Sequence, residues 1–343
     1  MRSLYLTCLS ANQPAGSQKD RKGPLGPFLL LSKDMIHNLN PNQFYTNRSY
    51  LTQWFLEDTL VVTDNDFQNV ELTQQLLQTH PVRHQVIDIT HNPYKEEWLS
   101  MSANVILTNN FSFWYDPKPN FVFFPLFLWM YSLRSNLWWS GFSFDAGSNK
   151  TKEIMCLNNR PRPHRTWLWD RFNSTGVISK MVYSFTQPDS QAEKYRWHYP
   201  LNIESENFDL NRNDIGVDHL VYTQCAVNLV TETCTDFTYV SEKTCKPFIA
   251  RQIPILVSSH NVNQFLTDAG LDMFEDIVPW RTWDNDQDEK SRLVKIADFV
   301  ESWVNSGTIL TDYQKALPRL ERNKQYFHSE QFRDRIMNQM VKL

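Results

Sequence analysis

The residues best suited to chemistry stand in a short polar stretch, residues 239–247, that precedes the apolar run at residues 253–257. Glu242 and Lys243 are adjacent there, and Glu232 stands ten positions before Glu242. A carboxylate can accept hydrogen bonds from ribose hydroxyls, and a neighbouring ammonium group can neutralise a phosphate. Adjacent opposite charges are also common on plain protein surfaces. Glu242 and Lys243 are therefore a candidate site only because they lie between two predicted strands.

A second group of donors lies upstream, in the segment Asn-Asn-Arg-Pro-Arg-Pro-His-Arg at residues 158–165. Arginine presents a planar fork of N–H donors that matches phosphate oxygens, and a helix N-terminus adds backbone N–H groups and a favourable dipole. The segment follows a predicted strand and precedes a predicted helix. Asn159, Arg160 and Arg165 are therefore candidates for binding a diphosphate, and a solvated basic turn is the alternative interpretation.

Pro247 indicates where the helix after Glu242 begins. Proline costs about 3 kcal/mol in a helix interior, whereas the first turn tolerates it. We therefore expect Pro247 in the first turn of the helix. That position places Lys243 and Lys246 at the helix N-terminus, where anions bind.

Short apolar runs separated by helical or polar segments predict an α/β fold. Strands are expected at residues 60–63, 84–89, 104–108, 121–124, 153–157, 181–185, 226–230 and 253–257. Helices are expected at residues 70–77, 166–172 and 290–304, with another ending near residue 269. The most apolar run, residues 121–131, is too short to span a membrane and predicts a core strand followed by a turn.

Length and composition narrow the possible classes of protein. The chain has 343 residues, a hydrophobic fraction of 41% and a formal net charge of -4. This length favours two domains, and we place them at residues 1–150 and 151–310, followed by a helical tail at 311–343. The net charge gives no indication of a nucleic-acid partner. Five scattered cysteines fit neither a disulfide framework nor a zinc site, and no secretory signal is recognisable. We expect a cytoplasmic protein without an integral membrane segment.

Residues 226–274 resemble the C-terminal domain of the family 10 glycosyltransferases, the α1,3/4-fucosyltransferases. The resemblance is carried by Asn228-Leu229, Glu232, Tyr-Val-Ser-Glu-Lys at 239–243, and Ile-Pro-Ile at 253–255. The segment Arg-Thr-Trp-Leu-Trp-Asp at 165–170 is similar to that family's arginine and aromatic-rich helix. Residues 153–305 also resemble uncharacterised glycosyltransferases of large viruses and phages, which share the pattern Ser-Glu-Lys-Thr-x-Lys-Pro.

The resemblance implies a GT-B fold, in which two Rossmann-like domains face a central cleft. Glu242 would then hold the ribose of a nucleoside-diphosphate sugar, Lys243 and Arg165 would hold its diphosphate, and Glu232 would line the donor-sugar side. The acceptor would be a glycan or a protein. No metal or other cofactor would be needed, because basic side chains stabilise the departing diphosphate.

The resemblance breaks down at the general base. The family uses a glutamate in a loop of the N-terminal domain, where the local match places Asn110. An amide cannot accept the proton of an acceptor hydroxyl. Asp116 and Asp64 are the alternative bases for the inverting reaction that the resemblance implies, since both follow predicted strands. The rival hypothesis is a catalytically inactive GT-B protein that binds glycans or serves as a structural component.

Overall fold

The computed structural model describes two compact units, Met1–Phe124 with Asn338–Leu343, and Pro125–Met337. The residues described are 52–56, 59–63, 84–88, 105–108, 111–116, 121–123, 125–132, 147–158, 162–185, 217, 220–236 and 238–338. The expected helix at residues 70–77 lies outside them. The domain limits at residues 150 and 310 stay a prediction.

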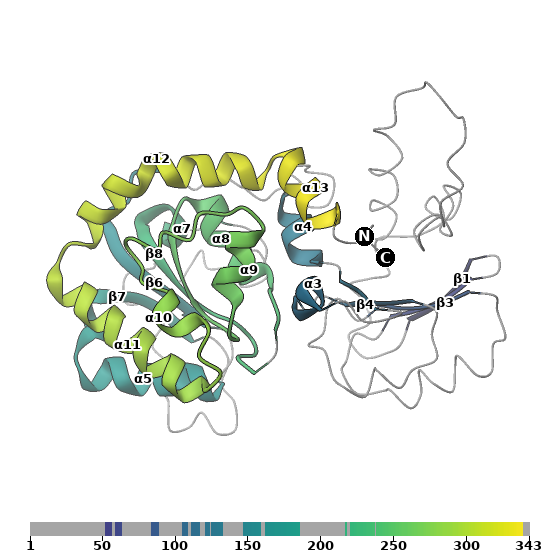
Figure 1. The fold of residues 1–343 in the computed structure, drawn as a ribbon. Helices are drawn as coiled ribbons and strands as arrows, with labels where there is room; N and C mark the ends of the chain where they lie inside the picture. Colours follow the sequence, from purple (N-terminus) through teal and green to yellow (C-terminus); the bar gives the residue numbers. More distant parts are fainter. Residues whose placement is uncertain are drawn as a thin grey trace. The chain divides into compact units, whose positions relative to one another are not determined.

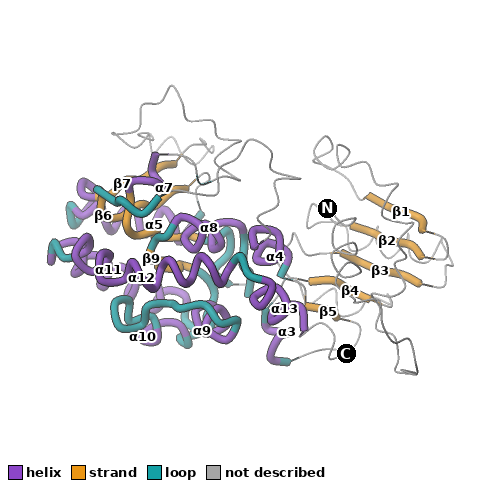
Figure 2. Tube along the Cα trace, turned by 90° about the horizontal axis from the view of Figure 1, so that it is seen from above, coloured by secondary structure: helices purple, strands orange, loops and turns teal. Residues whose placement is uncertain are grey.

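The first unit contains a sheet of five strands in sequence order, β1-β2-β3-β4-β5 (Figure 2). The strands are β1 (Thr52–Leu56), β2 (Thr59–Thr63), β3 (His84–Asp88), β4 (Val105–Thr108) and β5 (Phe121–Phe123). Strand β1 is antiparallel to β2, and the other pairs are parallel. The four expected strands of this half are confirmed, and β1 was not expected. A short helix, α3 (Ser112–Tyr115), precedes β5.

The apolar run at residues 121–131 forms a strand and a helix, so the predicted turn is wrong. Strand β5 ends at Phe123, and α4 (Leu126–Ser132) begins directly after Pro125. Proline is tolerated at a helix start because the first N–H groups of a helix have no partner within it. Leu128 and Tyr131 are buried, and α4 packs against α8 (Glu242–Ala250). The continuous apolar character therefore reflects burial rather than strand geometry.

The second unit is an α/β fold with a parallel sheet of four strands, which is compatible with a Rossmann-like domain. Its strands are β6 (Lys152–Asn158), β7 (Met181–Phe185), β8 (Cys225–Thr231) and β9 (Ile253–Val257). They are ordered β7-β6-β8-β9, and all pairs are parallel. All four strands were expected from their apolar runs. The chain thus leaves β6 towards β7 on one side and later returns to build β8 and β9 on the other.

Helices cover both faces of this sheet (Figure 1). On one face, α5 (Pro163–Ser174) and the 3-10 turn η5 (Val177–Lys180) pack against α11 (Glu289–Ser306). On the other face, α8 packs against α12 (Ile309–Phe327). Right-handed crossovers that run in opposite directions from β6 and β8 place their helices on opposite faces. The described residues of this unit also form α7 (Leu220–Gln224), α9 (Val262–Asp268), α10 (Arg281–Asp284) and α13 (Glu330–Asn338).

The long helix α11 confirms the expected amphipathic pattern. The residues predicted to share one face are all buried: Leu293, Ile296, Ala297, Val300 and Val304. Asp288 caps the N-terminus by accepting hydrogen bonds from the amides of Lys290 and Ser291, and Gly307 is the C-cap after the last helical residue, Ser306. No helix within the described part of the chain is both long and apolar enough to cross a membrane.

Position 270 requires glycine for two reasons, its backbone conformation and a closely packed neighbouring side chain. It has a φ of +95°, and a Cβ atom there would lie 2.9 Å from two ring carbons of Tyr326. We expect Gly270→Ala to lower the free energy of unfolding by about 2 kcal/mol or more, from backbone strain and overlap combined. Gly307→Ala is the matched control, because Gly307 has a φ of +66° and open space around it. Urea denaturation measures both, and equal losses would show that the contact with Tyr326 is unimportant.

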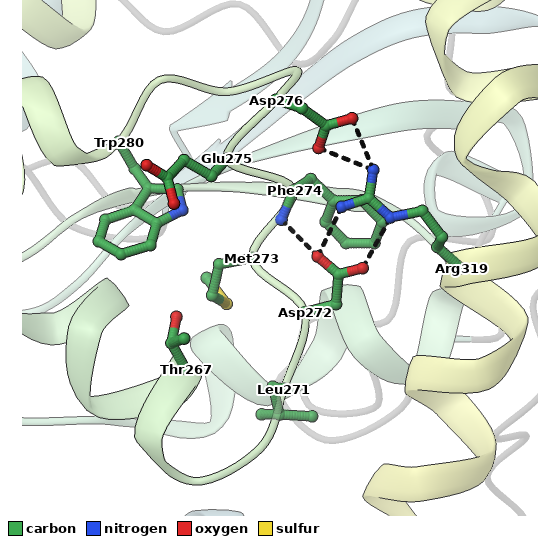
Figure 3. Close-up of a pocket in the computed structure, with 9 residues that line it drawn as sticks. All are labelled: Thr267, Leu271, Asp272, Met273, Phe274, Glu275, Asp276, Trp280 and Arg319. Atoms are coloured by element: carbon green, nitrogen blue, oxygen red, sulfur yellow. Dashed lines mark hydrogen bonds and ion pairs between the residues drawn. The ribbon is translucent and has the colours of Figure 1, made fainter.

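Arg319 clamps α12 to the loop that follows α9 (Figure 3). Its guanidinium donates two hydrogen bonds of 2.7 Å to Asp272 and bonds of 2.7 and 2.8 Å to Asp276. Burial raises the pKa of Asp272, but the bonds from Arg319 outweigh this effect, so its pKa lies below the usual value. The clamp is therefore complete at neutral pH and weakens only in acid.

We expect Arg319→Gln to lower the melting temperature at pH 7 by an amount that shrinks below about pH 4. The sign follows from the lowered pKa of Asp272: its ionised form stabilises the folded chain above the unfolded-state pKa and is lost as the pH falls. Lys315→Gln is the control, because the side chain of Lys315 is 70% exposed and an ion pair of an exposed lysine contributes little. A deficit for Arg319→Gln that is constant across the acid range would contradict the ion-pair explanation.

Candidate functional site

The candidate site lies where the sheet of the second unit reverses its strand order. Strands β6 and β8 are neighbours, and the connections that follow them run in opposite directions to β7 and β9. In open α/β sheets, ligands bind at the carboxyl ends of the strands that flank such a switch point. Here those ends carry Asn158 on β6 and Thr231 on β8, and the hydroxyl of Thr231 donates a hydrogen bond to the side chain of Asn158.

Helix α5 begins at the switch point, three residues earlier than the predicted start at residue 166. Pro163 occupies its first turn, and Arg162 is the exposed residue that precedes it. His164 and Arg165 are consequently helical and buried rather than part of an open loop. The reason is that the fixed φ of proline suits the first turn of a helix.

The guanidinium of Arg165 is held by the end of β8. It donates hydrogen bonds of 2.9 Å to the carbonyl of Thr231 and 3.0 Å to the carbonyl of Glu232. Burial lowers the pKa of Arg165, and the carboxylate of Glu232 opposes this effect. Only 4% of the residue is exposed, so its positive charge acts on the site from within the protein.

His164 contacts the same carbonyl. Its Nε2 lies 2.9 Å from the carbonyl oxygen of Glu232. A carbonyl only accepts, so Nε2 carries the proton. Burial and the charge of Arg165 lower the pKa of His164 to about 4. The ring is therefore neutral at physiological pH and acts as a fixed donor to the end of β8.

Glu232 lies inside the protein, and none of it is exposed. Its carboxylate accepts hydrogen bonds from the amide of Ser241 at 3.0 Å, the hydroxyl of Ser241 at 2.6 Å and the hydroxyl of Thr244 at 2.5 Å. The resemblance implied that Glu232 lines the donor-sugar side of a cleft. In the structure its side chain instead faces the first turn of α8.

The N-terminus of α8 presents the charged pair that the sequence singled out. Ser241 is the N-cap, and its hydroxyl accepts a hydrogen bond of 3.2 Å from the amide of Lys243. Glu242 and Lys243 occupy the first turn, pair with each other, and have side chains that are 22% and 30% exposed. They are thus the predicted site residues that solvent reaches at this helix end.

The pKa values of the pair are shifted so that both groups stay charged. Burial raises the pKa of Glu242, but Lys243 and Lys246 more than offset it, so the pKa lies below its usual value. Burial lowers the pKa of Lys243, but Glu242 and Glu232 outweigh it, so the pKa lies above its usual value. Lys243 therefore carries a positive charge beside a helix N-terminus, and in this structure Glu242 is the partner of that charge.

The predicted position of Pro247 is wrong. Helix α8 starts at Glu242, so Pro247 is its sixth residue and lies in the interior. The proline rule failed because the Ser241 cap, supported by Glu232, starts the helix a full turn earlier. Lys246 is therefore in the second turn and buried, with its Nζ 5.6 Å from the centroid of the Tyr222 ring. Lys246 is therefore not at the N-terminus of the helix, where it was predicted to lie.

No protein-family model matches this chain, and no curated protein does. Within the described residues, no group of three histidine, cysteine, aspartate or glutamate side chains is arranged to hold a metal ion.

The remaining predicted residues lie in the first unit or outside the described residues. Asp116 is the exposed residue that ends α3 in the first unit. Asn159, Arg160, Asp64 and Asn110 lie outside the described residues. Asp116 and Asp64 stay predictions as bases, and Asn159 and Arg160 stay predictions as donors.

Several residues that build the site were not predicted, and they differ in whether the sequence contained a signal. Ser241 directly before an acidic helix start is a recognisable N-cap pattern. Arg292 has no comparable signal. It is buried in α11 and donates a hydrogen bond of 2.7 Å to the carbonyl of Thr235, in the loop between β8 and α8. Its role depends on how α11 packs, which no local pattern specifies.

The hollow in Figure 3 is a less suitable place for a phosphate. It has a volume of about 520 Å³ and lies beside the clamp of Arg319. Three of its lining residues are acidic, Asp272, Glu275 and Asp276, and two of them occupy the guanidinium of Arg319. The balance of charge there disfavours an anion, whereas the first turn of α8 favours one.

Proposed function

We propose that the chain is a metal-independent glycosyltransferase that moves a sugar from a nucleoside diphosphate to a glycan or protein acceptor. The observation that carries the proposal is the capped N-terminus of α8, with Glu242 and Lys243 in its first turn, at the switch point of a Rossmann-like sheet. In the proposed GT-B arrangement, this unit binds the donor and the first unit binds the acceptor.

Each charged residue has a distinct role in the proposal. Lys243, beside the N-terminus of α8, binds the diphosphate and stabilises the negative charge that grows as the sugar–phosphate bond breaks. Glu242 accepts hydrogen bonds from the ribose hydroxyls. Arg165, held by the carbonyls of Thr231 and Glu232, adds positive charge from beneath the site rather than a direct contact. Asp116 or Asp64 removes the proton of the acceptor hydroxyl.

A catalytically inactive protein that binds glycans or nucleotide sugars is the second candidate. It is favoured by Asn110, which stands where the resemblance places the catalytic glutamate. The two candidates share the donor site and differ in turnover, so one assay separates them.

The test is a panel of GDP, UDP and dTDP sugars incubated with the full chain and mixed glycan acceptors, with release of the nucleotide as the readout. CMP sugars serve as a control, because they carry one phosphate and no diphosphate. We expect release from one nucleoside-diphosphate sugar and its loss in Glu242→Ala. Binding of a nucleotide without release from any donor would favour the inactive protein. The absence of both binding and release would contradict the proposed function.

A further inference from the structure

We propose that Glu232 is a positioning residue that sets the N-terminus of α8, and with it Lys243, for binding a diphosphate. This inference rests on the proposed function, because it concerns the same site. It assigns Glu232 to the support of the anion site rather than to contact with the donor sugar.

The carboxylate of Glu232 holds the start of α8 from below. It accepts hydrogen bonds from the amide and hydroxyl of Ser241 and from the hydroxyl of Thr244. Ser241 in turn caps the amide of Lys243. One buried carboxylate thus fixes the residue before the helix and a residue in its first turn.

The backbone of Glu232 ties this support to α5. Its carbonyl accepts hydrogen bonds from His164 and Arg165, and its amide donates one of 2.9 Å to the carbonyl of Val257 on β9. The backbone is therefore held by the sheet and by α5, while the side chain holds α8. Glu232 joins the two helix N-termini that flank the switch point.

Removing the negative charge of Glu232 would strengthen anion binding if charge alone mattered, but would weaken it if Glu232 positions the helix. The negative charge of Glu232 acts on both Arg165 and Lys243. Removing that charge leaves the surroundings of the site more positive, so Coulomb attraction alone would strengthen the binding of an anion. If Glu232 positions the helix, its removal weakens binding despite the gain in positive charge.

The test compares Glu232→Gln and Thr244→Val with the wild-type chain. Thr244→Ser is the rescue variant, because it keeps the hydroxyl that donates a hydrogen bond to Glu232. Asp284→Asn is the matched control, because Asp284 is a buried carboxylate that holds the start of α9 through the amides of Asn263 and Gln264. Calorimetry gives the Kd for GDP and UDP, and thermal melting shows how far each variant is destabilised.

We expect Glu232→Gln and Thr244→Val to bind about tenfold more weakly than the wild type, since small displacements of binding groups have large effects. Thr244→Ser is expected to bind as the wild type does. Asp284→Asn is expected to lose thermal stability but to keep the wild-type Kd. Unchanged or tighter binding by both Glu232→Gln and Thr244→Val would overturn the inference.

Hydrogen exchange at the amides of residues 241–243, measured without nucleotide, separates this inference from the proposed function. Faster exchange in Thr244→Val, but not in Thr244→Ser, shows that Glu232 and Thr244 hold the start of α8 even if the wild type binds neither GDP nor UDP. That combination would contradict the proposed function alone. Exchange that is unchanged in Thr244→Val would overturn the positioning role whatever the chain binds.

Discussion

Replacing Arg165 with methionine is expected to lower the free energy of unfolding by about 3–5 kcal/mol. Methionine matches much of the length of the side chain, so the main change is the loss of the charge and its donors. The carbonyl of Thr231 would lose its bond from Arg165, and the buried carboxylate of Glu232 would lose a compensating positive charge. An uncompensated buried charge is among the costliest defects that a single substitution can create.

Arg162→Met is the matched control for this prediction, because Arg162 lies three residues away at the same helix end and is exposed. Its replacement is expected to change the free energy of unfolding by less than about 0.5 kcal/mol. Urea denaturation of the full chain measures both variants. Similar values for the two would show that the bonds from Arg165 to the end of β8 contribute little.

Replacing Lys243 with glutamine is expected to weaken the binding of a nucleoside diphosphate between tenfold and a hundredfold. A hydrogen bond to a charged group contributes about 1.5–3 kcal/mol, and that range corresponds to this loss of affinity. The substitution keeps a polar side chain in the first turn of α8, so the helix start and its cap should persist. Binding should also become less sensitive to salt, because one positive charge that contacts the phosphates is gone.

The control for Lys243→Gln is Lys315→Gln, which removes the same charge from an exposed position on α12. Calorimetry at two salt concentrations measures the Kd of both variants for GDP and UDP. We expect the control to keep the wild-type Kd at each salt concentration. An equal weakening in both variants would assign the effect of Lys243 to net charge rather than to contact with the ligand.

The helices and strands of the second unit were predictable where the spacing of apolar residues in the sequence matches the pattern of burial. Strands β7 and β9 match their predicted limits, because each is a short apolar run ended by polar residues. The same reasoning found the buried face of α11. It failed at residues 126–132, where a buried helix and a buried strand have similar apolar composition.

The site was predictable only in part, for a physical reason. Local rules located Glu242 and Lys243 near a helix start, but Pro247 misplaced that start by a turn. The roles of Glu232 and Arg165 depend on contacts that are distant in the sequence. Arg165, for example, bonds to two carbonyls that lie more than sixty residues further along the chain. No local pattern distinguishes a carboxylate that binds a ligand from a buried carboxylate that holds the start of the helix at the binding site.

The measurement that tests the account most directly is hydrogen exchange of the full chain with and without a saturating nucleoside diphosphate. We predict slower exchange for the amides at the start of α8, residues 242–244, and at the start of α5, residues 164 and 165. The amides of α12 should be unchanged. Protection confined to other parts of the chain, or no binding of GDP, UDP or dTDP, would contradict a nucleotide site at the switch point.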